Sequence, residues 1–100
     1  MLITEKDLEI ARGLIADLDR ELEGRTSGTE REEITFGVGL LGDYADLCAK
    51  RQPGDGSRWE ATDEELIERF GGAVAYARNV LDWLHRGGIG LLTGAGLPIR

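Results

Sequence analysis

The chain has 100 residues, of which 41% are hydrophobic and only two are prolines, as expected of one folded domain rather than a disordered segment. Nineteen acidic residues against 12 basic ones give a net charge of −7. This charge disfavours direct binding to nucleic acid or to an anionic membrane, and it favours basic protein partners. Because Cys48 is the only cysteine, an internal disulfide and a thiolate zinc site are both excluded.

The start of the chain does not resemble a secretory signal. No basic segment leads into an apolar one, and the sequence turns acidic at Glu5. No uninterrupted apolar run approaches the length that crosses a bilayer. The sequence therefore predicts a cytoplasmic protein.

The first helix is predicted over residues 4–23. Thr4 followed by Asp7 matches a capping box, in which the threonine hydroxyl accepts the backbone N–H three residues on and the acid returns the bond. Apolar residues recur at steps of three and four and form one stripe: Leu8, Ala11, Ile15, Leu18 and Leu22. Residues 24–28 (Gly-Arg-Thr-Ser-Gly) end this helix and form a short connection.

A second capping signal, Thr29 with Glu32, opens a helix that is predicted over residues 29–51. Its main apolar stripe consists of Ile34, Val38, Leu41, Ala45 and Cys48. Three glycines at positions 37, 39 and 42 oppose this prediction, since each costs a helix interior up to about 1 kcal/mol relative to alanine. A short strand beginning at Ile34 is the competing prediction. We favour the helix because the cap and the stripe agree.

The turn-forming residues 52–57 lead through Trp59 into a third helix, predicted over residues 62–86 and opened by Thr62 with Glu65. Its stripe consists of Leu66, Phe70, Val74, Ala77, Leu81 and Leu84. The pair Gly71-Gly72 favours a bend or a division of this helix, and Gly87-Gly88 is the expected C-terminal cap. Residues 87–100 are apolar and rich in glycine, which predicts that they pack on the helices or on a second chain.

These patterns together predict an all-α protein, with a compact bundle of three main helices in a single domain over residues 1–100. The bundle carries an apolar, glycine-rich C-terminal segment. Several helices have two apolar faces, and three helices cannot bury all of them in so short a chain. Homodimerisation is therefore an open alternative.

The segment Gly37-Val38-Gly39-Leu40-Leu41-Gly42 matches the dinucleotide fingerprint G-x-G-x-x-G. That fingerprint functions only where a strand feeds a tight turn and a helix N-terminus. Here an acidic helix opening, residues 30–33, precedes it and no parallel strands are predicted. We interpret Gly39 and Gly42 instead as sites of close helix packing, and no cofactor is predicted.

Carboxylates three residues apart share a helix face. This spacing occurs at Glu30/Glu33, Asp43/Asp46 and Glu65/Glu68. Paired acids on neighbouring helices can hold Mg²⁺ while it binds the phosphates of a nucleotide. The arrangement resembles the all-α nucleotide pyrophosphatases of the MazG type, whose motif is E-x-x-E on one helix and E-x-x-D on the next. The resemblance implies a Mg²⁺-dependent hydrolase, although Asp43/Asp46 must replace one pair and Glu65/Glu68 lacks the closing aspartate. Simple solvated helix faces are the alternative interpretation, which we favour.

Asp82 and His85 are one helical turn apart, as in half of a metal site, but the chain has no second histidine. We interpret His85 as a side chain placed favourably at the C-terminal end of a helix dipole. Cys48 lies on an apolar stripe and is interpreted as a small buried hydrophobe. No catalytic residue and no metal ligand is predicted.

The function that the sequence favours is non-enzymatic protein binding, by a small acidic protein that occupies a basic surface on a nucleic-acid-handling partner. Small phage-encoded inhibitors, anti-CRISPR proteins among them, are of this general type, which is an analogy and not a family resemblance. Trp59 is interpreted either as a plug at the end of the bundle or as an exposed anchor for a partner. The predicted partner-binding residues are Glu30, Glu32, Glu33, Asp43, Asp46, Trp59, Glu64, Glu65 and Glu68. There are two alternatives. One is a helical homodimerisation module with the C-terminal segment as the contact, and the other is the Mg²⁺-dependent hydrolase.

Overall fold

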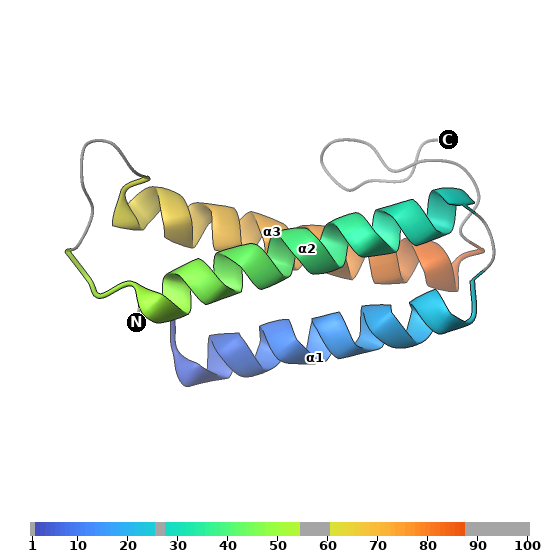
Figure 1. Cartoon of the computed structure of the whole chain (residues 1–100), viewed down its shortest axis with the longest axis horizontal. Coiled ribbons are helices and arrows are strands. Elements are labelled where there is room, and N and C mark those ends of the chain that lie inside the picture. Colours follow the sequence, from blue (N-terminus) through green and yellow to red (C-terminus); the bar gives the residue numbers. More distant parts are fainter. Residues whose placement is uncertain (1, 26–27, 55–60, 88–100) are drawn as a thin grey trace.

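The computed structural model describes residues 2–25, 28–54 and 61–87. Three helices make up most of this part: α1 (Glu5–Glu23), α2 (Gly28–Lys50) and α3 (Asp63–His85). They lie side by side, with α1 and α3 running in one direction and α2 in the other (Figure 1). The prediction of an all-α bundle of three helices is thereby confirmed. Trp59 and residues 88–100 lie outside the described residues, and so do the interpretations that depend on them.

Two of the three predicted caps are present. The Thr4 hydroxyl accepts the backbone N–H of Asp7 at 3.1 Å, and the Asp7 carboxylate accepts the backbone N–H of Thr4 at 3.1 Å. The Thr62 hydroxyl likewise accepts the backbone N–H of Glu65 at 3.1 Å. These bonds satisfy N–H groups that the first turn of a helix leaves without a partner.

The predicted cap at Thr29 is wrong, because α2 begins one residue earlier and places Thr29 inside its first turn. Glu30 lies in the first turn, where the helix dipole favours a negative charge. Glu30 is buried there, and its carboxylate lies 3.7 Å from the Arg25 guanidinium. Glu30 therefore joins the start of α2 to the connection that follows α1.

Neither group of glycines interrupts its helix. The helix α2 runs without a break through positions 37–42, so the competing prediction of a strand at Ile34 is wrong, and α3 is not divided at Gly71-Gly72. A glycine costs at most about 1 kcal/mol in a helix interior, whereas complete burial of a large apolar side chain stabilises by about 1.5–3 kcal/mol. Ile34 in α2 is fully buried and Phe70 in α3 nearly so, which holds these segments helical.

The end of α3 is close to the predicted position. Arg86 is the C-cap, and its N–H is directed to carbonyls of the last turn, including that of Asp82 at 3.1 Å. Gly87 follows with a φ of 114°, a conformation that residues with a side chain rarely adopt. The glycine at this position therefore lets the chain leave the helix without strain.

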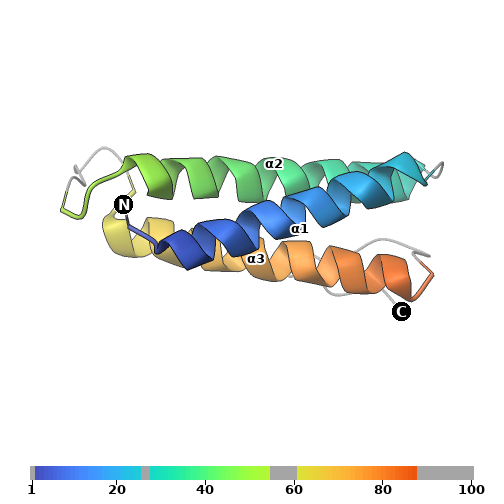
Figure 2. The ribbon, with the colours of Figure 1, turned by 90° about the horizontal axis from the view of Figure 1, so that it is seen from below.

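All three helices contribute to one core, and α1 crosses obliquely over α2 and α3 when the bundle is seen from below (Figure 2). The innermost side chains are fully buried and come from each helix in turn: Leu18, Ile34, Leu41, Cys48 and Val80. The buried residues of α3 include members of the predicted stripe, such as Phe70, and also Ala73, Val80 and Trp83 beside it. A single helix thus packs on two neighbours, as its double-faced pattern requires.

Close packing in α2 occurs at a different glycine from those predicted. A methyl group at Gly37 would lie 3.5 Å from the Tyr76 ring and 3.6 Å from the Leu18 side chain, so Gly37 is the point at which both neighbours come near. Gly39 is exposed, and nothing lies within 4 Å of the corresponding position there. A methyl group at Gly42 would lie 3.9 Å from the Ile15 side chain, an ordinary van der Waals contact. The interpretation of Gly39 as a helix-packing site within the bundle is therefore wrong.

Leu18→Ala should lower the free energy of unfolding by about 2–5 kcal/mol, because it removes a fully buried side chain and leaves a cavity between the helices. Leu47→Ala is a chemically identical control at a site that is 48% exposed, and it should cost less than about 1 kcal/mol. Urea unfolding followed by circular dichroism measures both values. Equal losses for the two variants would contradict the assignment of the core.

Candidate functional site

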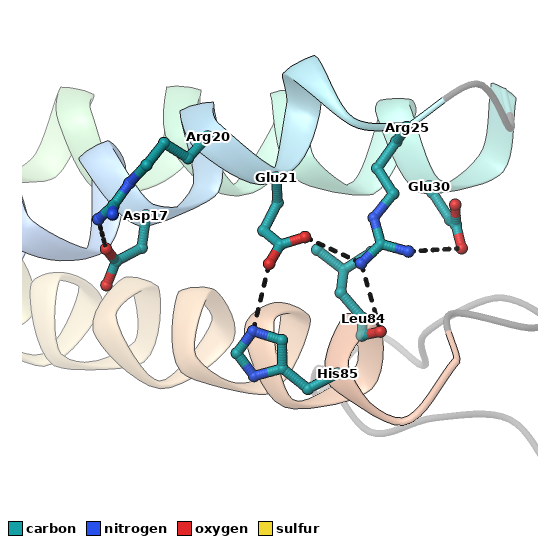
Figure 3. A network of polar contacts seen from close by, with 7 residues as sticks. All are labelled: Asp17, Arg20, Glu21, Arg25, Glu30, Leu84 and His85. Atoms are coloured by element: carbon teal, nitrogen blue, oxygen red, sulfur yellow. Dashed lines mark hydrogen bonds and ion pairs between the residues drawn. The ribbon is translucent and has the colours of Figure 1, made fainter.

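The most developed polar cluster lies where α1 ends, α2 begins and α3 ends (Figure 3). Its centre is Arg25, whose guanidinium donates to the Glu21 carboxylate at 2.8 Å and to the Leu84 carbonyl at 3.5 Å. The same guanidinium forms the 3.7 Å ion pair with Glu30. One cation therefore joins a carboxylate of α1, a carboxylate of α2 and the last turn of α3.

A second arginine reinforces this end of the bundle. Arg31, near the start of α2, donates to the backbone carbonyls of Leu22 and Arg25, at 3.1 Å in each case. The last carbonyls of a helix have no partner within it, and a cation is favourable there. The contacts of Arg25 and Arg31 are those of a structural clamp at the helix ends.

His85 belongs to this cluster and does not pair with Asp82. Its ring nitrogen Nε2 lies 3.3 Å from the Glu21 carboxylate, whereas Asp82 forms an ion pair with Arg86 at 2.7 Å. His85 occupies the last turn of α3, as its interpretation at the helix dipole requires. The hydrogen bond from Arg25 is the main cause that lowers the pKa of Glu21, and His85 adds to it against the opposing effect of burial.

Among the grooves lined by described residues, two flank the bundle, and neither gathers a reactive set of side chains. The first, about 380 Å³, is lined by Asp17, Arg20, Glu21, Leu81 and His85. Its charged groups contact one another, since Asp17 pairs with Arg20 and Glu21 pairs with Arg25 and His85. The second, about 300 Å³, is largely apolar and is lined by Ile3, Asp7, Ile10, Ile67, Phe70, Gly71, Val74 and Arg78.

Two of the predicted partner-binding acids have contacts within the bundle. Glu30 is buried beside Arg25, and the half-buried Glu33 accepts a hydrogen bond from the Tyr76 hydroxyl. Burial, together with this bond, raises the pKa of Tyr76, so the hydroxyl keeps its proton. Glu30 and Glu33 therefore connect α2 to its neighbours and offer little surface to a partner.

The other predicted acids in the described ranges are exposed. They are Glu32, Asp43, Asp46, Glu64, Glu65 and Glu68. Asp46 forms a surface ion pair with Lys50 at 2.9 Å, an interaction that contributes little stability in water. The remaining five form no ion pair with any other residue that the structure describes. Their charges are available to an external partner.

The pairs required by the pyrophosphatase alternative do not assemble. Asp43/Asp46 lie on α2 and Glu65/Glu68 lie on α3, and within residues 2–25, 28–54 and 61–87 no group of three or more His, Cys, Asp or Glu side chains could hold a metal ion. The dinucleotide fingerprint lies inside the continuous helix α2, so it forms no phosphate-binding turn. The described residues thus offer neither a preformed metal site nor a phosphate cradle.

The predicted partner-binding residues did not include two exposed apolar side chains of α2. Phe36 is 57% exposed and Leu47 is 48% exposed, although both are large apolar side chains. The ring of Phe36 meets that of Tyr76 edge-on, with centroids 5.4 Å apart and an interplanar angle of 74°. The signal was present in the sequence, because Phe36 falls on the side of the helix opposite to Ile34 and Leu41 when the residues are placed at 100° intervals.

Cys48 is confirmed as a buried hydrophobe. Its side chain is fully buried, and its thiol lies 3.7 Å from the Leu66 carbonyl. Burial raises the pKa of the thiol, and Arg51 opposes that effect only in part. Because the thiolate is the nucleophile, this environment disfavours reactivity.

Comparisons with known proteins identify no relative: no protein-family model, curated protein or solved structure matches the chain. Among the described helices, none combines the length and the apolar character needed to cross a membrane. The functional argument therefore depends on the surface of the bundle itself.

The central role of Arg25 can be tested with Arg25→Met. We expect it to lower the free energy of unfolding at pH 7 by about 1–2 kcal/mol, the contribution of hydrogen bonds to charged groups at a partly exposed site. The pKa of Glu21 is lowered from 4.5 in the folded state, so its stabilisation is present above that pH and is lost as the pH falls through the lowered value. The difference between wild type and variant should therefore shrink below pH 4.5.

Arg20→Met, within α1, is the matched control. Its ion pair with Asp17 joins side chains that are 74% and 49% exposed, so its loss should cost less than about 0.5 kcal/mol. Urea unfolding over a pH series gives both comparisons. A cost for Arg25→Met that stays constant down to pH 3 would contradict the assigned role of Glu21.

Cys48 should resist thiol reagents in the native protein. We expect reaction with 5,5′-dithiobis(2-nitrobenzoic acid) to be slowed by at least about a hundredfold relative to the same chain in urea, because modification requires the core to open. Absorbance of the released thiolate measures both rates, and the unfolded chain is the control. Native protein that reacts as fast as unfolded protein would show that Cys48 is accessible.

Proposed function

We propose that this protein is a non-enzymatic protein-binding protein that places exposed carboxylates against a basic surface of a nucleic-acid-handling partner. The single observation that carries the proposal is the division of its acids into two sets. One set, centred on Glu21 and Glu30, is engaged with Arg25 inside the bundle. The other set is exposed and unpaired in the described part of the chain.

Among the exposed side chains that form no ion pair, acidic residues outnumber basic ones. Acids that are exposed and form no ion pair within the described ranges are Glu5, Glu9, Asp19, Glu23, Glu32, Asp43, Glu64, Glu65 and Glu68. Basic residues of the same kind are Lys6, Arg12, Arg31, Arg69 and Arg78, of which Arg31 donates to backbone carbonyls. Acidic surfaces accelerate association with basic ones and make it sensitive to salt. A basic site that normally holds nucleic acid is a suitable target, which agrees with a phage-type inhibitor such as an anti-CRISPR protein.

The test uses the full chain and a purified basic nucleic-acid-binding protein from the native host, with the Kd measured across a salt series. Wild type should bind more weakly as salt rises. The variant Glu32→Gln/Asp43→Asn/Glu68→Gln should weaken binding about tenfold at low salt, if each exposed charge contributes a few tenths of a kcal/mol.

The control variant Glu5→Gln/Glu9→Gln/Asp19→Asn makes the same change in net charge on α1. It should alter the Kd by less than about threefold, because α1 contributes none of the predicted contact residues. An affinity that does not change with salt, or no association with any such partner, would refute the proposal. Equal effects of the two variants would show that only net charge matters.

A further inference from the structure

The exposed side of α2 carries apolar and acidic groups in one line. Glu32, Phe36, Gly39, Asp43 and Leu47 follow one another at steps of four, three, four and four residues, so they share a helix face. We call this line the α2 face. It lies opposite to the buried stripe that contains Ile34 and Leu41. The face therefore projects from a helix whose other side is fixed in the core.

The geometry of the α2 face suits a partner helix. Phe36 and Leu47 are separated by three helical turns, or roughly 16 Å. Between them lies Gly39, which has no side chain, and nothing lies within 4 Å of the position that a methyl group would take. A second helix can therefore approach the backbone here while its own apolar side chains meet Phe36 and Leu47.

The negative charge on the α2 face favours a basic partner. Glu32 and Asp43 form no ion pair with another described residue, and Asp46 beside them pairs only with Lys50. We propose that the α2 face docks a basic amphipathic helix of the partner protein, with Phe36 and Leu47 as apolar anchors and Glu32 and Asp43 opposite its lysines or arginines. This inference rests on the proposed function and deepens it by naming the surface and the element that it binds.

A second copy of the chain fits this face less well. An antiparallel pairing that sets Phe36 of one copy against Leu47 of the other places the two-fold axis between positions 41 and 42. The two Asp43 carboxylates then lie about 4–5 Å apart along the helix axes, close to the axis of symmetry. A parallel pairing aligns every acid with itself. Both arrangements oppose like charges, whereas a basic helix does not.

The probe is a fluorescent synthetic peptide of leucine and lysine, with leucines along one helix face at steps of four and three residues. A peptide of the same composition with scrambled leucine positions is its control. Wild-type full chain should bind the amphipathic peptide more tightly than the scrambled one, as measured by fluorescence anisotropy. Phe36→Ser/Leu47→Ser should weaken that binding at least about tenfold, as expected for anchor residues.

Ile67→Ser is the matched control, because Ile67 is 46% exposed but lies on α3. It should change the Kd by less than about twofold. Asp43→Lys supplies an independent test, since it keeps both anchors and reverses one charge, and it should also weaken binding. Circular dichroism and urea unfolding verify that each variant is folded.

Three outcomes would overturn the inference. If Phe36→Ser/Leu47→Ser binds both peptides as wild type does, while Glu32→Gln/Asp43→Asn/Glu68→Gln still loses affinity for the partner protein, the proposed function stands without this docking face. Wild type that fails to distinguish the two peptides overturns the amphipathic-helix assignment. Sedimentation of wild type as a dimer, converted to a monomer by Phe36→Ser/Leu47→Ser, assigns the face to a second copy.

Discussion

The burial of one side of α2 between α1 and α3 is the constraint on which the rest of the structure depends. Ile34, Leu41 and Cys48 are fully buried along this side, and they keep α2 helical through three glycines. Once that side is fixed, the orientation of every other α2 residue follows from the 100° step of the helix. Phe36 and Leu47 are exposed for this reason and not because the helix lacks a core.

Charge at the helix ends completes the bundle. Arg25 and Arg31 contact the carbonyls that close α1 and α3, and Arg25 also engages Glu21 and Glu30. At the other end, Arg51 lies 3.1 Å from Asp63 at the start of α3. Arg25 and Arg51, whose side chains are only 25% and 12% exposed, are thus engaged within the protein. The exposed, unpaired charges of the described residues remain mostly acidic, in keeping with the net charge of the chain.

Much of the fold could be predicted from the sequence, because caps and apolar spacing are local signals. The ends of α1 and α3 agree with Thr4, Thr62 and Gly87. The start of α2 could not be predicted in the same way. Glu30 in its first turn contacts Arg25, and this contact exists only after the chain has turned back. The helix α3 is not divided at Gly71-Gly72 for a related reason, since the packing of Phe70 outweighs local propensity.

The candidate site was less predictable, because an acid in a sequence carries no sign of its partner. Glu30 and Glu33 have the same spacing as Asp43 and Asp46, yet only the first pair is used to join helices. That difference engages Glu30 and Glu33 with neighbouring side chains of the bundle and leaves Glu32 exposed beside Phe36. Exposed apolar side chains that are flanked by unpaired charges reduce solubility little. They restrict which partner can dock, because the partner must match both the apolar groups and the charges. A rigid helix that presents both kinds of group selects for shape and charge together.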